Sequence, residues 1–225
     1  MSLDNYLSLL HSEPAELLIA ADEKARKIFG QTITFSRNFF VPITHQCRNR
    51  CGYCSFVSDD VNSWITPDKF QKLLQQANLA KCSEILLTLG EKPELKYESA
   101  REFLLQNNCS STIEYVKLFC DLALDEKLLP HSNPGVISFE ELKYLKDSNA
   151  SLGLMLESSS PRLLEQGEAH YNSPSKNPEL RIETIENAGK LKIPFTTGLL
   201  IGIGETWKER IESLIILQSI SRRFK

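Results

Sequence analysis

The sequence lacks an excess of charge of either sign, a long apolar run and a basic leader. Its 225 residues include 26 basic and 29 acidic side chains, a formal net charge of -3, so the composition does not favour a polyanion such as a nucleic acid as a partner. No stretch approaches the roughly eighteen consecutive apolar residues of a membrane-spanning helix. We therefore expect a cytoplasmic protein with neither a nucleic-acid partner nor a membrane partner.

The chain also lacks tandem repeats, low-complexity segments and Gly/Ser-rich linkers. With 41% apolar residues, a chain of this length can bury one sizeable core. We expect residues 1–30 to form a helical extension of two short helices that ends at Gly30 and packs outside the first strand. Residues 31–225 are then the main domain.

Disulfides are not expected either, although the chain has six cysteines, because thiols in a reducing compartment are free, buried or bound to metal. Cys82, Cys109 and Cys120 are scattered along the sequence, and we interpret them as structural. Cys120 falls on the apolar face of an expected helix, where a free thiol acts as a small hydrophobic side chain.

The other three cysteines form a compact motif. Cys47, Cys51 and Cys54 have the spacing C-x3-C-x2-C in the segment CRNRCGYC. Structural zinc sites and electron-transfer clusters normally have four protein ligands, whereas three thiolates can hold three irons of a 4Fe-4S cluster and leave the fourth iron open. A zinc site completed by His45 or Cys82 is the alternative. However, His45 lies only two residues before Cys47, and Cys82 lies beyond an expected helix, so neither has paired zinc spacing.

Apolar runs alternate with amphipathic segments after residue 30, which indicates parallel strands joined by right-handed crossovers. The helical segments begin at recognisable caps, namely Thr66, Ser111, Ser138 and Thr206. Only five strands fit before the last helix, which is too few to close a barrel. We therefore expect an α/β fold, a partial (β/α) barrel whose C-terminal part is missing; a naturally open five-stranded sheet is the alternative. The expected strands are residues 38–44, 84–89, 128–133, 151–157 and 194–202.

Residues with useful chemistry follow these strands, at the carboxyl ends where ligands gather in such folds. Cys47 follows the first strand, Gly90 and Glu91 follow the second, and Glu157 ends the fourth. The glycine-spaced segment 198–205 after the fifth strand does not match the dinucleotide fingerprint G-x-G-x-x-G, so a Rossmann fold is not supported.

The cysteine motif resembles the signature of the radical S-adenosylmethionine (SAM) enzymes. This resemblance implies that Cys47, Cys51 and Cys54 bind a 4Fe-4S cluster and that the amine and carboxylate of SAM chelate the open iron. One-electron reduction then splits the sulfonium and yields a 5′-deoxyadenosyl radical. The protein itself supplies position and electrostatics.

The same resemblance implies further cofactor-binding residues. Tyr53 is expected against the adenine, and the segment TLGE, with Gly90 and Glu91, is expected to hold the ammonium group, although Leu89 stands where the superfamily often has a second glycine. Glu157 is expected to bind the ribose hydroxyls or the amine; the alternative is a solvated strand end that caps a turn. Two more residues assigned to the cofactor are Gly202 and Ile203, with Ile203 packed on the adenine.

Longer phrases resemble one branch of these enzymes, the synthases of 7,8-didemethyl-8-hydroxy-5-deazariboflavin (FO). They include LTLGEKPE, LPHSNPGVIS, LGLMLESSS and IPFTTGLLIGIGET, and the likeness covers nearly all of residues 30–210. It implies a lyase and cyclase that closes the deazaflavin ring in coenzyme F-420 biosynthesis, from an adduct of a hydroxybenzyl group with a ribitylamino-uracil, with loss of ammonia. His131 and His170 are then candidate catalytic residues, and Asn133 and Lys176 are candidates for substrate binding; turn residues and a solvated lysine are the alternative.

Implied partners are a small-molecule substrate, an electron donor such as ferredoxin or flavodoxin, and a partner synthase subunit. Two other functions stay open at this point. One is a sister enzyme that joins tyrosine to the diaminouracil or acts in menaquinone synthesis. The other is a non-catalytic metal-binding fragment, since loss of the last strand and helix exposes apolar edges while every cysteine remains.

Overall fold

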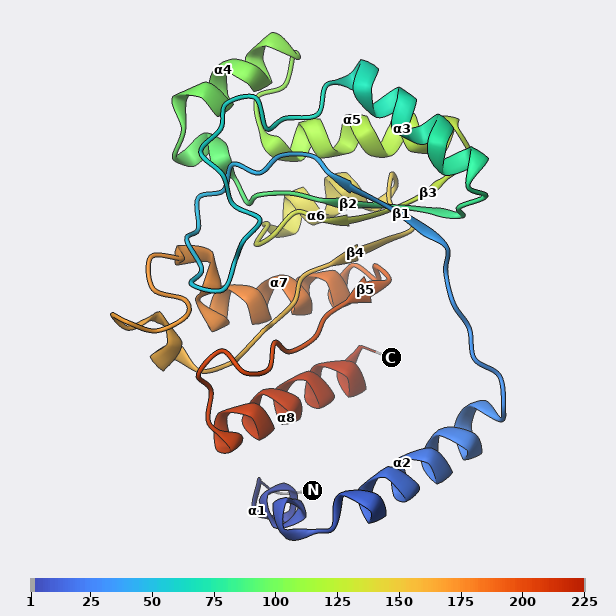
Figure 1. The fold of residues 1–225 in the computed structure, drawn as a ribbon, viewed down its shortest axis with the longest axis vertical. Helices are drawn as coiled ribbons and strands as arrows, with labels where there is room; N and C mark the ends of the chain where they lie inside the picture. Colours follow the sequence, from blue (N-terminus) through green and yellow to red (C-terminus); the bar gives the residue numbers. More distant parts are fainter. Residues whose placement is uncertain (1–2, 225) are drawn as a thin grey trace.

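Five parallel strands form one sheet in the computed structural model, which describes residues 3–224. The strand order is β1-β2-β3-β4-β5, so neighbours in sequence are neighbours in the sheet, as right-handed βαβ crossovers produce. This confirms the predicted α/β fold with five parallel strands (Figure 1). The strands are β1 Asn38–Pro42, β2 Glu84–Thr88, β3 Leu129–Asn133, β4 Ser151–Gly153 and β5 Phe195–Thr196.

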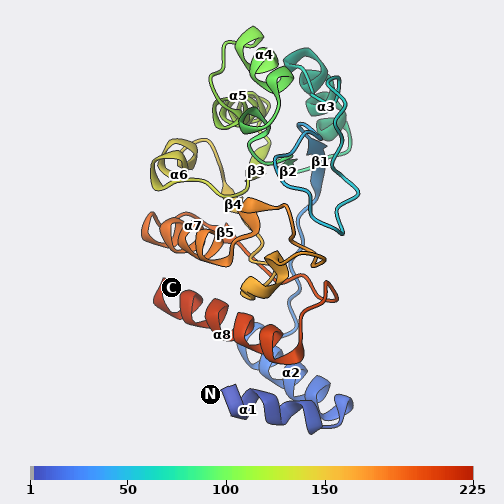
Figure 2. The same ribbon diagram turned by 90° about the vertical axis from the view of Figure 1, so that its left-hand side faces the viewer.

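Helices connect the strands and cover the outer face of the sheet. Figure 2 shows α5 to α8 stacked along one side of the molecule, with the strands beside them. The helices are α1 Leu3–Ser8, α2 Pro14–Phe29, α3 Pro67–Leu79, α4 Glu98–Gln106, α5 Thr112–Asp125, α6 Phe139–Lys146, α7 Pro178–Lys190 and α8 Trp207–Arg223. Short 3-10 turns cover Leu9–His11, Pro93–Leu95, Pro161–Leu164 and Pro174–Lys176.

The last two strands are shorter than their apolar runs predict. Beyond Gly153 the pairing is reduced to the Leu154 N–H, which donates to the Thr196 carbonyl at 3.0 Å, and an isolated parallel bridge between Glu157 and Leu199. The reason is that side chains replace backbone partners there: Leu156 N–H donates to the Thr197 hydroxyl at 3.3 Å, and the Met155 carbonyl accepts from the Arg181 guanidinium. The ladder therefore opens where the cavity described below begins.

Capping side chains start the helices at the predicted residues. Ser138 and Thr206 each accept a hydrogen bond from the backbone N–H three residues later, and the glutamate at that position bonds back, which completes a capping box. Ser111 also caps α5, but Glu114 reaches the N–H of Ser110 instead, so only one half of a capping box is formed there. Each cap stabilises its helix by about 1 kcal/mol.

The N-terminal helices do not pack outside the first strand, so that expectation is wrong. Helix α1 contacts α8, and Tyr6 bonds to Gln218 at 2.9 Å, next to the opposite edge of the sheet (Figure 1). Residues 31–37 run without helix or strand, and seven extended residues span up to about 25 Å. This length carries α1 and α2 away from β1. The division of the chain at residue 30 stays a prediction.

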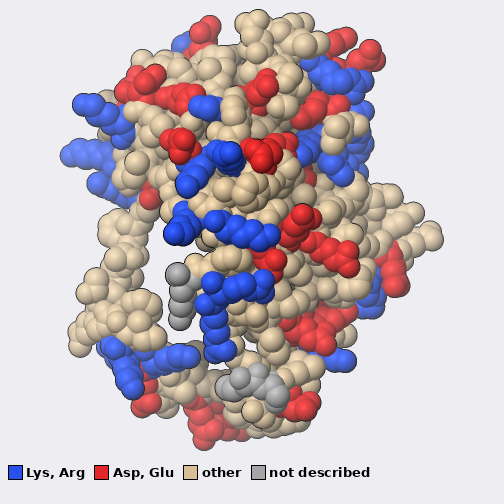
Figure 3. All heavy atoms as spheres, turned by 180° about the vertical axis from the view of Figure 1, so that it is seen from behind, with Lys and Arg blue, Asp and Glu red and all other residues tan. Residues whose placement is uncertain are grey.

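Basic side chains gather on the outer face seen in Figure 3. Cations in the last turn of a helix are favourable, because they complement the negative end of the helix dipole. Arg223 is also paired with Glu186 at 2.8 Å. Helices α6, α7 and α8 all carry such residues in their last turns, namely Lys143, Lys146, Lys190, Arg222 and Arg223.

No helix within residues 3–224 has the length and apolarity that crossing a bilayer requires.

Tyr115 of α5 lies fully buried in the core, where its ring meets Trp64 edge-on and Phe119 at a tilt. Its hydroxyl donates to the Ile65 carbonyl at 2.6 Å. Replacing Tyr115 by phenylalanine leaves that buried carbonyl without this partner, so we expect a loss of about 1–3 kcal/mol in the free energy of unfolding. Urea unfolding of the apo-protein measures the loss. Tyr144→Phe, at an exposed position, serves as the control and is expected to change stability by no more than about 0.5 kcal/mol.

Candidate active site

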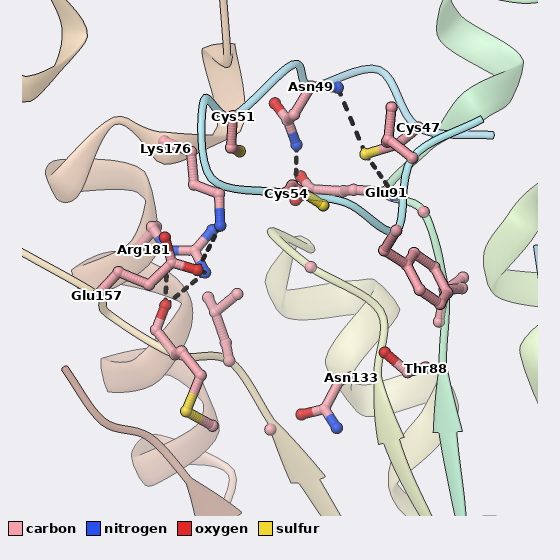
Figure 4. A pocket seen from close by; sticks show the side chains of 18 of the residues that line it. Cys47, Asn49, Cys51, Cys54, Thr88, Glu91, Asn133, Glu157, Lys176 and Arg181 are labelled. Atoms are coloured by element: carbon pink, nitrogen blue, oxygen red, sulfur yellow. Dashed lines mark hydrogen bonds and ion pairs between the residues drawn. The ribbon is translucent and has the colours of Figure 1, made fainter. Parts of the chain in front are cut away.

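A cavity of about 360 Å³ opens at the carboxyl ends of the strands. Segments after β1, β2, β3 and β4 and the start of α7 form it, and Figure 4 shows their side chains converging. Ligand sites in this position are typical of parallel α/β sheets. The predicted site residues that line it are Cys47, Cys51, Tyr53, Cys54, Gly90, Glu91, Asn133, Glu157 and Lys176.

The three cysteines of the motif all face this cavity (Figure 4). Cys47 is buried, and its Sγ accepts hydrogen bonds from the backbone N–H groups of Asn49 at 3.4 Å and Glu91 at 3.1 Å. Burial raises the pKa of the Cys47 thiol, while these two donors act in the opposite direction. Amide donors aimed at the sulfur stabilise its thiolate form, which is the form that binds metal.

The thiols are not gathered around a single point, as the ligands of one metal ion are. No three His, Cys, Asp or Glu side chains within residues 3–224 lie close enough to share one metal ion. The Zn–S bond is about 2.3 Å long, so all ligands of one zinc ion must surround the same point. In a 4Fe-4S cluster each thiolate binds a different iron, so the thiolates lie further apart. The alternative zinc ligands are engaged elsewhere: His45 Nδ1 lies 2.8 Å from the Phe56 carbonyl, and Cys82 packs against the core.

Glu91 is buried beside the cysteine loop and keeps one oxygen free. Its Oε2 accepts from Asn49 Nδ2 at 3.3 Å, while Oε1 has no hydrogen-bond partner among the described residues. Burial raises the pKa of Glu91, although the nearby Ser175 hydroxyl and the cations Arg181 and Lys176 act to lower it. Gly135 leaves the space for this side chain, since a Cβ there would lie 2.4 Å from the carboxyl group. A buried acceptor without a donor fits a cationic ligand group such as an ammonium.

Glu157 is held by three side chains from the segment after β4 and from α7. Lys176 Nζ lies 2.5 Å from Oε1, Arg181 Nη2 lies 3.8 Å from the same oxygen, and His170 Nε2 lies 3.1 Å from Oε2. The Tyr53 hydroxyl also donates to Oε2. Burial alone would raise the pKa of Glu157, but these hydrogen bonds and cations outweigh it and lower the pKa to about 2.

The backbone at Glu157 is strained. Its φ of 64° lies in the left-handed region, which is costly for a residue other than glycine. Hydrogen bonds on both sides hold it there: its N–H donates to the Gly198 carbonyl at 2.9 Å, and its carbonyl accepts from the N–H of Leu200 at 3.0 Å. The strain turns the carboxylate toward the cavity, as strained residues often do at functional sites.

A family comparison bears directly on this arrangement. Residues 41–215 match the model of the Radical SAM superfamily. The chain belongs to the radical SAM superfamily. Members of this superfamily use a 4Fe-4S cluster and SAM, so the cofactors implied by the cysteine motif are confirmed. The free oxygen of Glu91 and the thiols around the cavity fit these two groups.

Named relatives within this superfamily are FO synthases. The 7,8-didemethyl-8-hydroxy-5-deazariboflavin synthase of Methanothermobacter thermautotrophicus is 50% identical over 193 residues, which cover 85% of this chain and 58% of that protein. The enzyme of the same name from Methanopyrus kandleri is 45% identical and is covered to 59%. An FO synthase of Nocardia farcinica is 37% identical over all of this chain but over only 28% of its own length. The chain thus spans just over half the length of the two archaeal relatives.

Solved structures of radical SAM enzymes share the fold. Methylornithine synthase (PylB) superposes with a TM-score of 0.67 at 22% identity, over 98% of this chain and 61% of its own. The hydrogenase maturase HydG superposes with a TM-score of 0.74 at 19% identity, over 100% of this chain and 49% of its own. At these identities the likeness concerns the fold alone.

Four predicted site residues do not line the cavity of this radical SAM chain. His170 is buried behind Glu157, and His131 lies two residues before Asn133 on the same face of β3. The N–H groups of Gly202 and Ile203 donate to the Glu205 carboxylate at 3.0 Å and 2.9 Å. The assignment of Gly202 and Ile203 to the cofactor stays a prediction, and so does the catalytic role of His131 and His170.

Sequence reasoning missed two residues that organise the radical SAM site. Asn49, inside the cysteine loop, is buried and joins Glu91 to the N–H of Ser175, from which its Oδ1 accepts at 3.1 Å. Arg181 is 4% exposed and bonds to the Met155 carbonyl while it faces Glu157. Asn49 had a local signal, because an asparagine between metal-binding cysteines often bonds to backbone groups. Arg181 had none.

Gly90 is required where the end of β2 meets the cysteine loop. A Cβ at this residue would lie 1.9 Å from the Gln46 carbonyl oxygen and 2.9 Å from Cys47 Cβ. We expect Gly90→Ala to lower the free energy of unfolding by about 1–3 kcal/mol, as overpacking does, and to weaken SAM binding to the reconstituted protein. Calorimetry measures both effects. Gly198→Ala is the control, since its new Cβ meets only Met155 Sδ, at 3.4 Å; an equal loss in both variants would contradict this account.

Proposed function

We propose that this chain carries the cofactor-binding portion of an FO synthase. The reaction is the ring closure of 7,8-didemethyl-8-hydroxy-5-deazariboflavin from the adduct of a hydroxybenzyl group with a ribitylamino-uracil, with loss of ammonia. The carrying observation is the cavity itself, in which three thiols, the buried Glu91 and the largely buried Glu157 meet at the strand ends. The identity of 45–50% to the archaeal enzymes supports this reaction over other radical SAM reactions.

Each polar group of the cavity then has a role. Cys47, Cys51 and Cys54 would hold the 4Fe-4S cluster through three thiolates. The free Oε1 of Glu91 accepts from the ammonium group of SAM, and Gly90 brings the backbone close enough to line the same site. When bound, the cluster and SAM would supply the one-electron chemistry that hydrogen abstraction from the substrate requires.

Glu157 and the two cations beside it, Lys176 and Arg181, orient ligands rather than transfer protons. With a pKa near 2, this carboxylate stays ionised at neutral pH and serves as an acceptor for hydroxyl groups of SAM or of the ribityl chain. Lys176 lines the cavity beside it and can turn toward an anionic or hydroxyl oxygen. His170 acts as a positioning residue, since it touches Glu157 and Tyr53 but not the cavity.

Reduction requires an external electron donor, and the proposal assigns a ferredoxin or a flavodoxin to this task. A partner synthase subunit that supplies the adduct belongs to the same proposal, as does a cytoplasmic location. The reactive state must be shielded from water and held close to the substrate, because most of the rate gain comes from position.

Anaerobic reconstitution with iron and sulfide, followed by reduction in the presence of SAM, tests the proposal. Supplied with the preformed adduct, the protein is expected to release 5′-deoxyadenosine, ammonia and the fluorescent deazaflavin. Turnover with free tyrosine and the diaminouracil instead would identify the sister enzyme. A brown protein that leaves SAM intact would support the non-catalytic fragment, and a colourless protein with bound zinc would remove the cluster.

A further inference from the structure

We propose that Asn133 recognises the pyrimidine ring of the substrate through the N–H and C=O groups of its imide edge. The inference rests on the proposed function and specifies how the same cavity selects its substrate. It is carried by the row of residues that ends the central strands and by the close packing behind Asn133.

Asn133 ends β3 on the face of the sheet that lines the cavity. The strand register pairs it with Thr88 of β2, and the pairing of Ser132 with Leu152 places Gly153 on its other side. Thr88, Asn133 and Gly153 all line the cavity that the cluster cysteines also line. Figure 4 shows the Asn133 amide below Thr88 and apart from Glu157, Lys176 and Arg181. A ligand that reaches the cysteines can therefore also reach this amide.

Gly153 makes the position of the amide possible. A Cβ at residue 153 would lie 2.0 Å from Asn133 Oδ1 and 3.0 Å from His131 Nε2. Gly153 is not among the glycines with positive φ in the described chain. Close approach, rather than backbone freedom, therefore explains this glycine. The amide therefore packs against the backbone of β4 at Gly153, with its Oδ1 nearest.

His131 and Ser151 support the amide from the side away from the cavity mouth. His131 Nδ1 lies 2.5 Å from Ser151 Oγ, and its Nε2 lies beside Gly153 on the Asn133 side, where the two side chains can act as hydrogen-bond partners. Among residues 3–224 the Asn133 side chain makes no other hydrogen bond to protein. An amide offers two donor hydrogens and two acceptor lone pairs, so Asn133 keeps both a donor and an acceptor for a ligand.

This remaining capacity matches an imide better than the other parts of the adduct. A side-chain amide presents a donor and an acceptor side by side in one plane, as does an imide edge with its N–H and C=O. A ribityl chain presents rotating hydroxyls and a phenol presents one, so neither needs a fixed pair. Phe56, Val57 and Met155 add apolar walls to the cavity, which suit the faces of a ring.

Binding of two probes to the reconstituted holoenzyme with SAM tests the proposal. One probe is the adduct, and the other is the same adduct methylated on the imide nitrogen, which removes the N–H. The wild-type protein is expected to bind the parent roughly tenfold more tightly, as one hydrogen bond in a buried site implies. Asn133→Ala is expected to bind both probes alike.

Gly153→Ala keeps the amide but displaces it, and it is expected to lose the same discrimination. Asn78→Ala, which removes an amide on the exposed side of α3, is the matched control and is expected to keep the tenfold preference. Asn133→Ser replaces the alanine variant if that variant does not fold. Retention of the preference in the folded Asn133 and Gly153 variants overturns the inference and leaves the proposed function intact. Failure of the wild-type holoenzyme to bind or convert the adduct overturns the proposed function, and the inference with it.

Discussion

Replacement of Cys51 by alanine is expected to remove the brown absorption of the reconstituted protein and to reduce 5′-deoxyadenosine release to background. Two remaining thiolates cannot hold three irons of a cubane cluster, and the cofactor supplies all of the radical chemistry. The fold does not depend on this residue, because Cys51 is a half-buried free thiol on a loop. The free energy of unfolding of the apo-protein is therefore expected to stay within about 0.5 kcal/mol of the wild type.

Cys82→Ser is the control for this variant. Cys82 is also a half-buried free thiol, but it packs against the core and does not line the cavity. Its serine variant is expected to keep full iron content and full SAM cleavage. Iron and sulfide analysis, visible absorption and chromatography of 5′-deoxyadenosine measure the three quantities. A Cys51→Ala protein with unchanged iron content would show that the third thiolate is not a ligand.

Local features of the sequence predict most of the fold and one part of the site. The apolar runs give the positions of all five strands, and the caps at Ser138 and Thr206 give the starts of α6 and α8. The cysteine motif is equally local, because ligand spacing within one loop reflects the geometry of the group it holds. These signals depend on residues that are neighbours in the chain.

Contacts between distant residues could not be predicted in the same way. Asn49 bonds to Ser175, which lies 126 residues further along the chain, and the position of α1 beside α8 depends on the path of residues 31–37. Arg181 looks in the sequence like a solvated residue of an amphipathic helix, yet it is buried against Glu157. Buried polar pairs depend on the complete fold, and no periodicity in the sequence marks them.

Glu157→Gln is expected to lower the free energy of unfolding of the apo-protein by about 3–5 kcal/mol at pH 7. The amide keeps the shape of the side chain but removes its charge. Lys176 and Arg181, whose side chains are 12% and 4% exposed, then remain as buried cations without their counter-ion. Guanidinium unfolding measures the loss, and the exposed Glu102→Gln is the control, with an expected change within about 0.5 kcal/mol.

The lowered pKa of Glu157 predicts how the free energy of unfolding depends on pH. A pKa near 2 in the folded protein, against about 4.3 in the unfolded chain, makes Glu157 contribute on the order of 3 kcal/mol above the unfolded value. That contribution is lost as the pH falls from about 5 toward 2, because the unfolded state takes up the proton first. The stability difference between wild type and Glu157→Gln is therefore expected to shrink over this range.

A double variant separates the pair from the carboxylate alone. If Glu157→Gln destabilises the protein because it leaves cations uncompensated, then Lys176→Met in the same chain removes one of those cations. Glu157→Gln/Lys176→Met is therefore expected to be more stable than Glu157→Gln, since replacement of a buried ion pair costs less than breaking it. Equal or lower stability of the double variant would mean that Glu157 acts mainly through His170 and Tyr53, whose hydrogen bonds to it both variants alter alike.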